Sequence, residues 1–397
     1  MANTPYLEKD AIISGVGQSQ IGRRLPRNGL QLTIDAVKSA LDDAGLTPSD
    51  IDGVASWPGK LEAQQPGFSP VGITDLKEAM GLQLNWYSAG FEATQMSSII
   101  NACMAVATGQ ARHVICFRTM TEATSMAKGK RSSVIGAGNN RIGGSFQWQI
   151  PFNAFSATNW VGLIASRYIK EFGLTREQLA QIPINARRNA SLNSRAIYRE
   201  IITLDDYLAA RMISSPLCLY DCDVPIDGST VIIISHKNTA ADLNCTPIRI
   251  EAIAGTLKGR DSWDQQTDLT RFNGDATGQR LWSRTDLKAK DVDIAQLYDG
   301  FSFLTLLWLE ALGFCGKGEA GEFIAGGRRI SRDGQLPLNT HGGQIGAGRT
   351  HGFGFFYEAV KQMRGQAGEH QLNTQPQIAA IANGGGNIAG AALLVRD

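Results

Sequence analysis

Apolar positions along the chain alternate between helix-like and strand-like spacing. In TIDAVKSALDDAG, residues 33–45, and SIINACMAVATG, residues 98–109, apolar side chains recur every three or four positions and a glycine ends each run. This spacing predicts amphipathic helices. Apolar runs such as HVICF, residues 113–117, and the segment PQIAAIANGGG, residues 376–386, predict buried strands instead. The alternation indicates an α/β protein with a mainly parallel or mixed sheet.

Two patterns occur twice in the chain. LTPSDIDGVAS, from Leu46, and LKAKDVDIAQL, from Leu287, carry aspartates at matching positions and each leads into a short apolar run. SIINACMAVATGQA, from Ser98, is matched by YEAVKQMRGQAG, from Tyr357, and a strand-like segment follows each. The repetition predicts two related α/β halves.

The length of the chain also favours two cores, because single domains rarely grow much beyond about 250 residues. We expect an N-terminal half over residues 1–240 and a C-terminal half over residues 241–397. Residues 121–215 turn rich in Gly, Asn and Arg and then helical. That stretch is interpreted as an insertion lying over one half. The run FSFLTLLWLEALGF, residues 301–314, predicts a helix buried against a sheet.

Charge and cysteine usage exclude several functional classes. A net charge of +1, with thinly spread Lys and Arg, provides no electrostatic footprint for nucleic acid or for anionic lipid. No apolar stretch is long enough to span a bilayer, and the first residues lack the pattern of a signal peptide. The six cysteines are scattered without CxxC spacing, which favours reduced, buried thiols in a cytoplasmic protein.

The stretch HGGQIGAGRTHGFG, from His341 to Gly354, concentrates glycine and two of the five histidines. It lacks the GxGxxG spacing of a dinucleotide cradle, and its position late in the chain also speaks against that function. His341 and His351 have no third ligand at a recognised metal-binding spacing, so no metal is expected. A loop that places backbone N–H groups around a reacting oxygen is the favoured interpretation, with Gly343 and Gly348 in it.

Four blocks together resemble the thiolase superfamily, in the branch related to the sterol carrier protein thiolases. They are DAVKSALDDAGLTPSDID, PLCLYDCDVPIDGSTVIIIS, QLYDGFSF and NTHGGQIGAGRTHGFG, in the family's order. The resemblance covers nearly the whole chain. It implies a thiolase fold, that is, two pseudo-equivalent α/β halves in a layered αβαβα arrangement with an inserted loop domain.

The catalytic residues of a thiolase are not matched. Glu92 stands roughly where the family has its nucleophilic cysteine, and Arg349 stands where the family has the histidine of Gly-His-Pro. Ala382 falls near the second cysteine, in the run IANGGGN that also places Gly385 at the substrate. Because a thiolase needs a cysteine thiolate, the chain is not expected to form an acyl-cysteine.

The YDGFSF block resembles most closely the thiolase-like retro-aldolases of steroid side-chain degradation. That resemblance implies cleavage of a bulky β-hydroxyacyl-CoA, with Tyr298 as the residue that carries the proton transfer and Glu92 as a further candidate base. Asp299 and His341 are expected among the groups that bind the substrate and its oxyanion. Arg349 replaces a second functional tyrosine of that group, and His351 is a candidate replacement acid or base. A phenol is a poor base at its ordinary pKa. We therefore expect Arg349 to lower the pKa of Tyr298.

Each candidate also has an ordinary structural interpretation. Tyr298 could be a buried strand-end tyrosine, and Glu92 could cap the helix that follows it. Arg349 could pair with an acid such as Asp299, and His341 could hold its loop through a hydrogen bond. The residues Asp221, Cys222 and Asp223, beside a sharp turn, are interpreted as structural.

The predicted function is a carbon–carbon lyase that needs no cofactor and takes coenzyme A as part of its substrate. Two alternatives stay open. One is a thiolase-like acyltransferase or Claisen-type enzyme, and the other is a non-catalytic subunit that binds CoA esters. A homodimer is expected because the HVICF strand would otherwise leave an unpaired sheet edge. The resemblance also implies a small OB-fold, zinc-ribbon partner, since the chain has no zinc-ribbon cysteines of its own.

Overall fold

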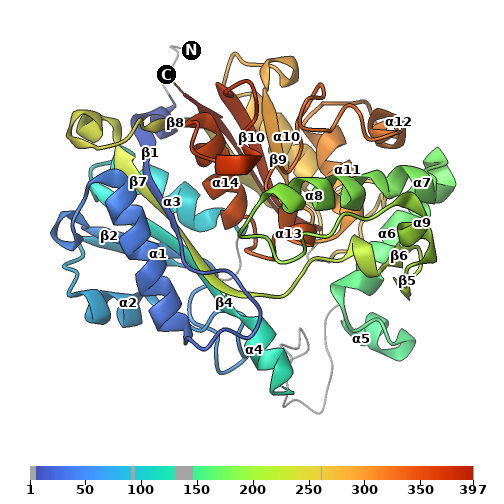
Figure 1. Ribbon diagram of the computed structural model, residues 1–397, viewed down its shortest axis with the longest axis horizontal. Helices are drawn as coiled ribbons and strands as arrows, with labels where there is room; N and C mark the ends of the chain where they lie inside the picture. Colours follow the sequence, from blue (N-terminus) through green and yellow to red (C-terminus); the bar gives the residue numbers. More distant parts are fainter. Residues whose placement is uncertain (1–5, 91–93, 130–145, 261, 397) are drawn as a thin grey trace.

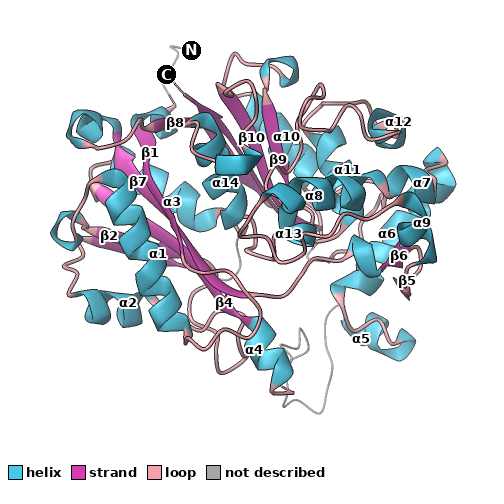
Figure 2. Cartoon of the chain, viewed as in Figure 1, coloured by secondary structure: helices cyan, strands magenta, loops and turns pink. Residues whose placement is uncertain are grey.

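The computed structural model describes residues 6–90, 94–129, 146–260 and 262–396. Within these residues, nine strands form one mixed sheet in the order β3-β2-β4-β7-β1-β8-β11-β10-β9, with helices on both sides (Figures 1 and 2). Its strands are β1 (Ala11–Gln18), β2 (Gly53–Ser56), β3 (Trp86–Ala89), β4 (His113–Thr121), β7 (Asp227–His236), β8 (Ile248–Thr256), β9 (Ile294–Leu297), β10 (Ile378–Gly385) and β11 (Ile388–Val395).

The two halves of this sheet have matching topology. In the N-terminal half β7 runs antiparallel to both β4 and β1, and β2 is parallel to β4. In the C-terminal half β11 runs antiparallel to both β10 and β8, and β9 is parallel to β10. The halves meet where β1 pairs with β8 at Ile12–Arg249 and Ile13–Ile248. The prediction of two pseudo-equivalent α/β halves is confirmed.

The repeated sequence blocks form the same local structure in both halves. Helix α1 (Gly29–Ala44) leads through a turn into β2, and α10 (Gly274–Trp282) leads through a turn into β9. In the first turn the Thr47 N–H donates to the Asp50 carboxylate over 2.8 Å, and in the second the Lys288 N–H donates to Asp291 over 2.8 Å. The matched aspartates therefore cap equivalent turns.

The second pair of matched aspartates ties each turn to the next strand of its half. Asp52 accepts hydrogen bonds from the backbone N–H groups of Arg112 and His113, where β4 begins. Asp293 accepts them from the N–H groups of residues 377 and 378, where β10 begins. A buried sheet needs such partners for its strand ends, so the repeat reflects a shared structural requirement.

The helices form layers around the two half-sheets. Helices α1 and α2 (Ile73–Met80) cover one face of the N-terminal half, where Ile115 and Phe117 of β4 point. The alternate residues Val114 and Cys116 point toward α3 (Ser97–Ala107) on the other face. Helix α3 also contacts β8, and α14 (Phe353–Met363) contacts β9, β10, β1 and β7. These two helices lie between the halves, as the αβαβα arrangement requires.

The chain between β4 and β7 forms a helical insertion over the C-terminal half (Figure 1). Its α8 contacts α11 (Ser302–Ala311) and α13 (Gly343–Gly346), and its α7 contacts α12 (Ala320–Ile324). Its elements are α4 (Glu122–Ala127), α5 (Phe146–Gln149), α6 (Ala157–Phe172), α7 (Arg176–Leu179), α8 (Gln181–Leu192), α9 (Leu204–Ala209), β5 (Met212–Ser214) and β6 (Leu217–Cys218). We propose that the insertion covers residues 121–215 and that the two halves divide at residue 240.

One expectation about the sheet is wrong. The HVICF segment lies in β4, which pairs with both β2 and β7, so it leaves no free edge. The edge strand of this half is β3, where Tyr87 is 71% exposed. The buried helix over residues 301–314 is confirmed as α11, in which Trp308 is fully buried. No described helix combines the length and apolar character needed to cross a bilayer.

Candidate active site

The YDG block and the Gly-rich loop are joined by one buried carboxylate. Tyr298 and Asp299 follow β9, and Asp299 accepts hydrogen bonds from the N–H groups of Gln344, over 2.9 Å, and Ile345, over 3.5 Å. Gly343 makes this approach possible, because a Cβ there would lie 1.9 Å from Asp299 Oδ2 and φ is +61°. Burial raises the pKa of Asp299 to about 7. Asp299 therefore holds the Gly-rich loop against the end of β9, and its contact with a substrate stays a prediction.

Tyr298 is buried with its hydroxyl group at the centre of a polar cluster. It is 6% exposed, and its hydroxyl accepts a hydrogen bond of 3.2 Å from Gln95 Nε2. Burial raises the pKa of Tyr298 to about 12, and the charge of Asp223 adds to the rise, while Gln95 and Arg349 oppose it. The expectation that Arg349 lowers this pKa below its ordinary value is wrong, because desolvation outweighs the cation.

Arg349 pairs with two carboxylates, neither of which is Asp299. Its Nε and Nη2 donate to Glu122 Oε2 over 3.1 and 2.9 Å, and its Nη1 donates to Asp223 Oδ1 over 3.2 Å. The pairing suggested between Arg349 and Asp299 is therefore wrong. Glu122 begins α4 and Asp223 lies just before β7, so the guanidinium joins the two ends of the insertion to the Gly-rich loop.

Asp223 is a site residue that the sequence analysis did not identify. It was grouped with Asp221 as structural, and Asp221 does accept hydrogen bonds from the Tyr207 hydroxyl and the Cys218 N–H. Asp223 instead faces Arg349, and burial raises its pKa to about 7. The available signal was Arg349 itself, because an arginine in a largely buried loop requires a nearby acid.

His351 lies among aromatic rings and a second arginine. Its Nδ1 is 3.1 Å from the guanidinium of Arg118, and its ring packs edge-on against Phe68. Arg118 also lies over the rings of Trp57 and Phe68. Burial and the charges of Arg118 and Arg349 hold the pKa of His351 well below its ordinary value. The imidazole is therefore neutral, and its low pKa makes the uptake of a proton unfavourable.

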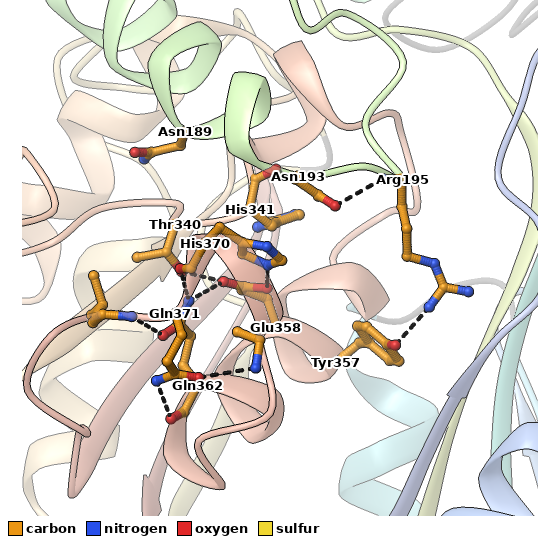
Figure 3. A network of polar contacts seen from close by, with 12 residues as sticks. Asn189, Asn193, Arg195, Thr340, His341, Tyr357, Glu358, Gln362, His370 and Gln371 are labelled. Atoms are coloured by element: carbon orange, nitrogen blue, oxygen red, sulfur yellow. Dashed lines mark hydrogen bonds and ion pairs between the residues drawn. The ribbon is translucent and has the colours of Figure 1, made fainter.

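His341 lies beside Glu358 and His370 in the polar network of Figure 3. Its ring packs edge-on against Phe355, and burial lowers its pKa to about 4. The hydrogen bond that holds the loop involves its backbone carbonyl, which accepts from Asn193 Nδ2 over 2.9 Å. Its Nδ1 has no partner within the described part of the chain. The structural role expected of His341 thus comes from its main chain.

A cavity of about 370 Å³ adjoins His341 and contains a saturated polar network. Glu358 accepts from Gln362 Nε2 over 2.9 Å, is 3.0 Å from His370 Nε2, and also accepts from the Thr340 hydroxyl (Figure 3). These partners outweigh burial and lower the pKa of Glu358 to about 2. Every oxygen of this carboxylate is in use, so the network is structural.

Three further residues, Glu92, Gly348 and Gly385, were expected in the site. Glu92 lies outside the described residues. Gly348 adopts φ +118° and lines the same cavity as His341, with Ile226 where a side chain would extend. Gly385 ends β10 and packs against Leu304 and Trp263. Their contact with a substrate stays a prediction.

The Gly-rich loop has fewer free N–H groups than an oxyanion-hole loop would suggest. The N–H groups of Gln344 and Ile345 donate to Asp299, and the Arg349 N–H donates to the Val224 carbonyl. Side-chain amides are less committed. Neither amide atom of Asn383 has a partner among the described residues, and the Gln344 amide faces the Tyr298 hydroxyl, whose pKa it lowers, without another partner there; both side chains are fully buried. Buried, unpaired amides mark places where a ligand or water can bind.

The thiols of the chain are all unsuited to nucleophilic catalysis. All six cysteines are free, and burial raises the pKa of each thiol. The pKa of the Cys222 thiol, which lies beside Asp223, rises to about 12. An activated cysteine needs a lowered pKa. No group of three or more His, Cys, Asp and Glu residues in the described chain could hold a metal ion.

Comparison with known proteins agrees with this architecture. Residues 255–396 match the thiolase C-terminal domain-like family. The chain is 33% identical to the steroid side-chain-cleaving aldolase of Thermomonospora curvata over 89% of its length and 90% of that protein. It is also 33% identical to 17-hydroxy-3-oxo-4-pregnene-20-carboxyl-CoA lyase of Mycobacterium tuberculosis, over 90% of its length and 92% of that protein.

Solved structures show the same similarity. The Ltp2-ChsH2(DUF35) aldolase superposes with a TM-score of 0.87 at 31% identity, covering 99% of both chains. Human mitochondrial 3-ketoacyl-CoA thiolase superposes with a TM-score of 0.70 at 12% identity, covering 99% of this chain and all of that one. The second similarity concerns the fold alone.

Proposed function

The chain belongs to the thiolase superfamily, in the group that contains the steroid side-chain-cleaving aldolases, and on that premise we propose that it is a carbon–carbon lyase. It cleaves a bulky β-hydroxyacyl-CoA by a retro-aldol reaction. The products are a ketone and a shortened acyl-CoA. Support for a steroid-like acyl group comes from the names of the two relatives, which act on steroid side chains and on a pregnene carboxyl-CoA.

The observation that carries this proposal is the replacement of thiol chemistry by a buried phenol. A thiolase needs a thiolate beside a base, and every cysteine of this chain has a raised pKa. The group at the centre of the site is Tyr298, hydrogen-bonded to Gln95 and close to Asp223 and Arg349. A retro-aldol reaction needs a proton acceptor, a proton donor and support for an enolate, and it needs no nucleophile.

Tyr298 is suited to the donor role. A pKa near 12 keeps the phenol protonated at neutral pH, so Tyr298 gives a proton to the α-carbon of the enolate. The buried amides of Gln344, beside the Tyr298 hydroxyl, and of Asn383 are the groups that we assign to the enolate oxygen. Preorganised donors in a dry site stabilise such a charge strongly.

The proposal includes partners and location. We propose a cytoplasmic protein and a homodimer formed through the exposed edge strand β3, since an uncovered strand edge otherwise invites pairing. We also propose an OB-fold, zinc-ribbon partner chain; the structural relative is itself a two-protein Ltp2-ChsH2(DUF35) aldolase. Light scattering at micromolar concentration should give a dimeric mass. A monomeric mass would refute the β3 pairing.

Product analysis after mixing the protein with a β-hydroxyacyl-CoA tests the activity. A ketone plus a shortened acyl-CoA is expected, together with an unmodified protein mass. A stable acyl adduct on the protein would indicate that the protein is an acyltransferase and not a lyase. Unchanged substrate, with and without a co-purified partner chain, would instead favour a non-catalytic subunit that binds CoA esters.

A further inference from the structure

The segment around Asp223 is fixed by backbone hydrogen bonds to both blocks of the site. The Asp223 N–H donates to the Gly300 carbonyl over 3.2 Å, which places it beside the loop that follows Tyr298. The next residue, Val224, donates to the Gln344 carbonyl over 3.2 Å and accepts from the Arg349 N–H over 2.8 Å. Asp223 therefore lies where the insertion, the YDG block and the Gly-rich loop meet.

The carboxylate of Asp223 is only half used. Its Oδ1 accepts from Arg349, and its Oδ2 has no donor among the described residues. Two neighbouring buried aspartates differ in this respect. Asp299 accepts from two backbone N–H groups, and Asp221 accepts from Tyr207, Ser302 and Cys218. A proton acceptor needs an uncommitted oxygen within reach of the reacting group, and of these three carboxylates only Asp223 has an oxygen without a donor among the described residues.

The charged and titratable groups that face Asp223 come from every neighbouring element; they are Arg349, Glu122, Tyr298, Asp299, Cys222 and, behind Arg349, Arg118. Burial raises the pKa of Asp223 to about 7, Arg349 opposes the rise and Glu122 adds to it. The charge of Asp223 in turn raises the pKa of Tyr298. Two groups with pKa values so far apart form a natural base and acid pair.

We propose that Asp223 is the general base of this site, and that it takes the proton of the β-hydroxyl group while Tyr298 supplies the proton to the α-carbon. This inference rests on the proposed lyase function. The hydroxyl O–H electron pair forms the C=O bond of the ketone, and the Cα–Cβ electron pair becomes the thioester enolate. Tyr298 then protonates the α-carbon, and the proton held by Asp223 returns to the phenolate. The enzyme ends in its starting protonation state.

The other candidate bases are less suited by their contacts. His351 lies against the Arg118 cation, and both arginines disfavour its protonation. Glu122 pairs more tightly with the cation, because its Oε2 receives two nitrogens of Arg349 whereas Asp223 receives one. A group whose lone pairs or proton affinity are already committed accepts a substrate proton less readily.

Asp223→Asn tests the proposal in the full-length protein, with any co-purified partner chain. The substitution keeps the size of the side chain and removes its basicity. Turnover should fall by about 10²–10⁴-fold with little change in KM. In the parent, kcat/KM should rise with pH through about 7, as Asp223 loses its proton. Glu122→Gln is the matched comparison, and it should move this rise to lower pH because the Glu122 charge raises the pKa of Asp223.

A rescue experiment separates basicity from structural charge. In Asp223→Gly, added formate should restore turnover by at least about tenfold, whereas nitrate, a planar anion of the same charge and negligible basicity, should not. Equal rescue by both anions, or an Asp223→Asn variant within about threefold of the parent, would overturn the assignment. A parent protein that yields no ketone would instead overturn the lyase function itself. Thermal unfolding of each variant shows that a loss of turnover does not reflect a loss of folding.

Discussion

Two buried polar clusters adjoin the Gly-rich loop, and the carboxylates at their centres have different hydrogen-bond partners and opposite pKa shifts. Around Glu358 three donors occupy the carboxylate, and its pKa falls to about 2 (Figure 3). Around Asp223 one arginine is shared with a second acid, and the pKa rises to about 7. Both carboxylates are buried. The donors and charges around each carboxylate, together with its burial, set the pKa, and they lower it for Glu358 and leave it raised for Asp223.

The comparison also separates the two histidines of the loop. His341 lies on the side of the Glu358 cluster and His351 on the side of Arg118 and Arg349. Burial keeps both rings neutral. Protonation of either ring is therefore unfavourable near neutral pH, and a catalytic role for His351 stays a prediction.

The largest effect is expected from Tyr298→Phe, which deletes one hydroxyl from the Asp223 cluster and keeps the packing of the ring. Turnover on a cleavable β-hydroxyacyl-CoA should fall by about 10²–10⁴-fold, while substrate binding changes little. Steady-state kinetics with a binding titration measure both quantities. Parent-like turnover would exclude Tyr298 as the proton carrier.

Next in size is Arg349→Met, which removes the only cation paired with Glu122 and Asp223 in the described residues. Two carboxylates remain buried without a partner, and removing one member of a buried pair costs about 3–5 kcal/mol. Denaturant unfolding at pH 8 measures the loss. A loss that persists unchanged at pH 5, where the raised pKa of Asp223 leaves that acid protonated, would show that its charge is not the cause.

Glu358→Gln tests the opposite cluster through stability. Because the pKa of Glu358 is lowered from 4.5 to about 2, the carboxylate stabilises the fold fully above about pH 4.5. This contribution disappears as the pH falls toward 2, and it amounts to roughly 3 kcal/mol. The variant should lose that stability at pH 7 and depend less on pH below 4.5. Identical acid-unfolding curves for variant and parent would contradict the assignment.

The smallest effect is expected for the stability of Asp223→Asn. This variant should gain stability, whereas Arg349→Met and Glu358→Gln should lose it. A pKa raised from 3.8 to about 7 means that the protonated acid is favoured in the fold, with its stabilisation complete below pH 3.8 and lost as the pH rises through 7. Asparagine resembles the protonated form. The variant should therefore gain roughly 1–3 kcal/mol at pH 8 while it loses activity. A destabilised variant would place Asp223 with Glu358 as a structural carboxylate.

Local sequence determined most of the fold. The helical and strand-like runs correspond to α1, α3, α14, β4 and β10. The matched blocks from Leu46 and Leu287 predicted equivalent turns, because an aspartate that caps a turn acts within three residues of its partner. The placement of Tyr298 beside the Gly-rich loop followed from the order of the blocks, and the joining of those blocks by Asp299 shows why that order matters.

Only the tertiary structure decided which groups the site uses and in which protonation state. The partners of Arg349 come from residues 122 and 223, more than a hundred positions away, and no local pattern marks them. Whether β4 or β3 forms the sheet edge depends on strand pairing, which the apolar run of each strand does not reveal. The pKa of Tyr298 rises and does not fall, because desolvation depends on all the atoms that surround the phenol. Sequence specifies which groups are present, and burial in the folded chain sets their charge.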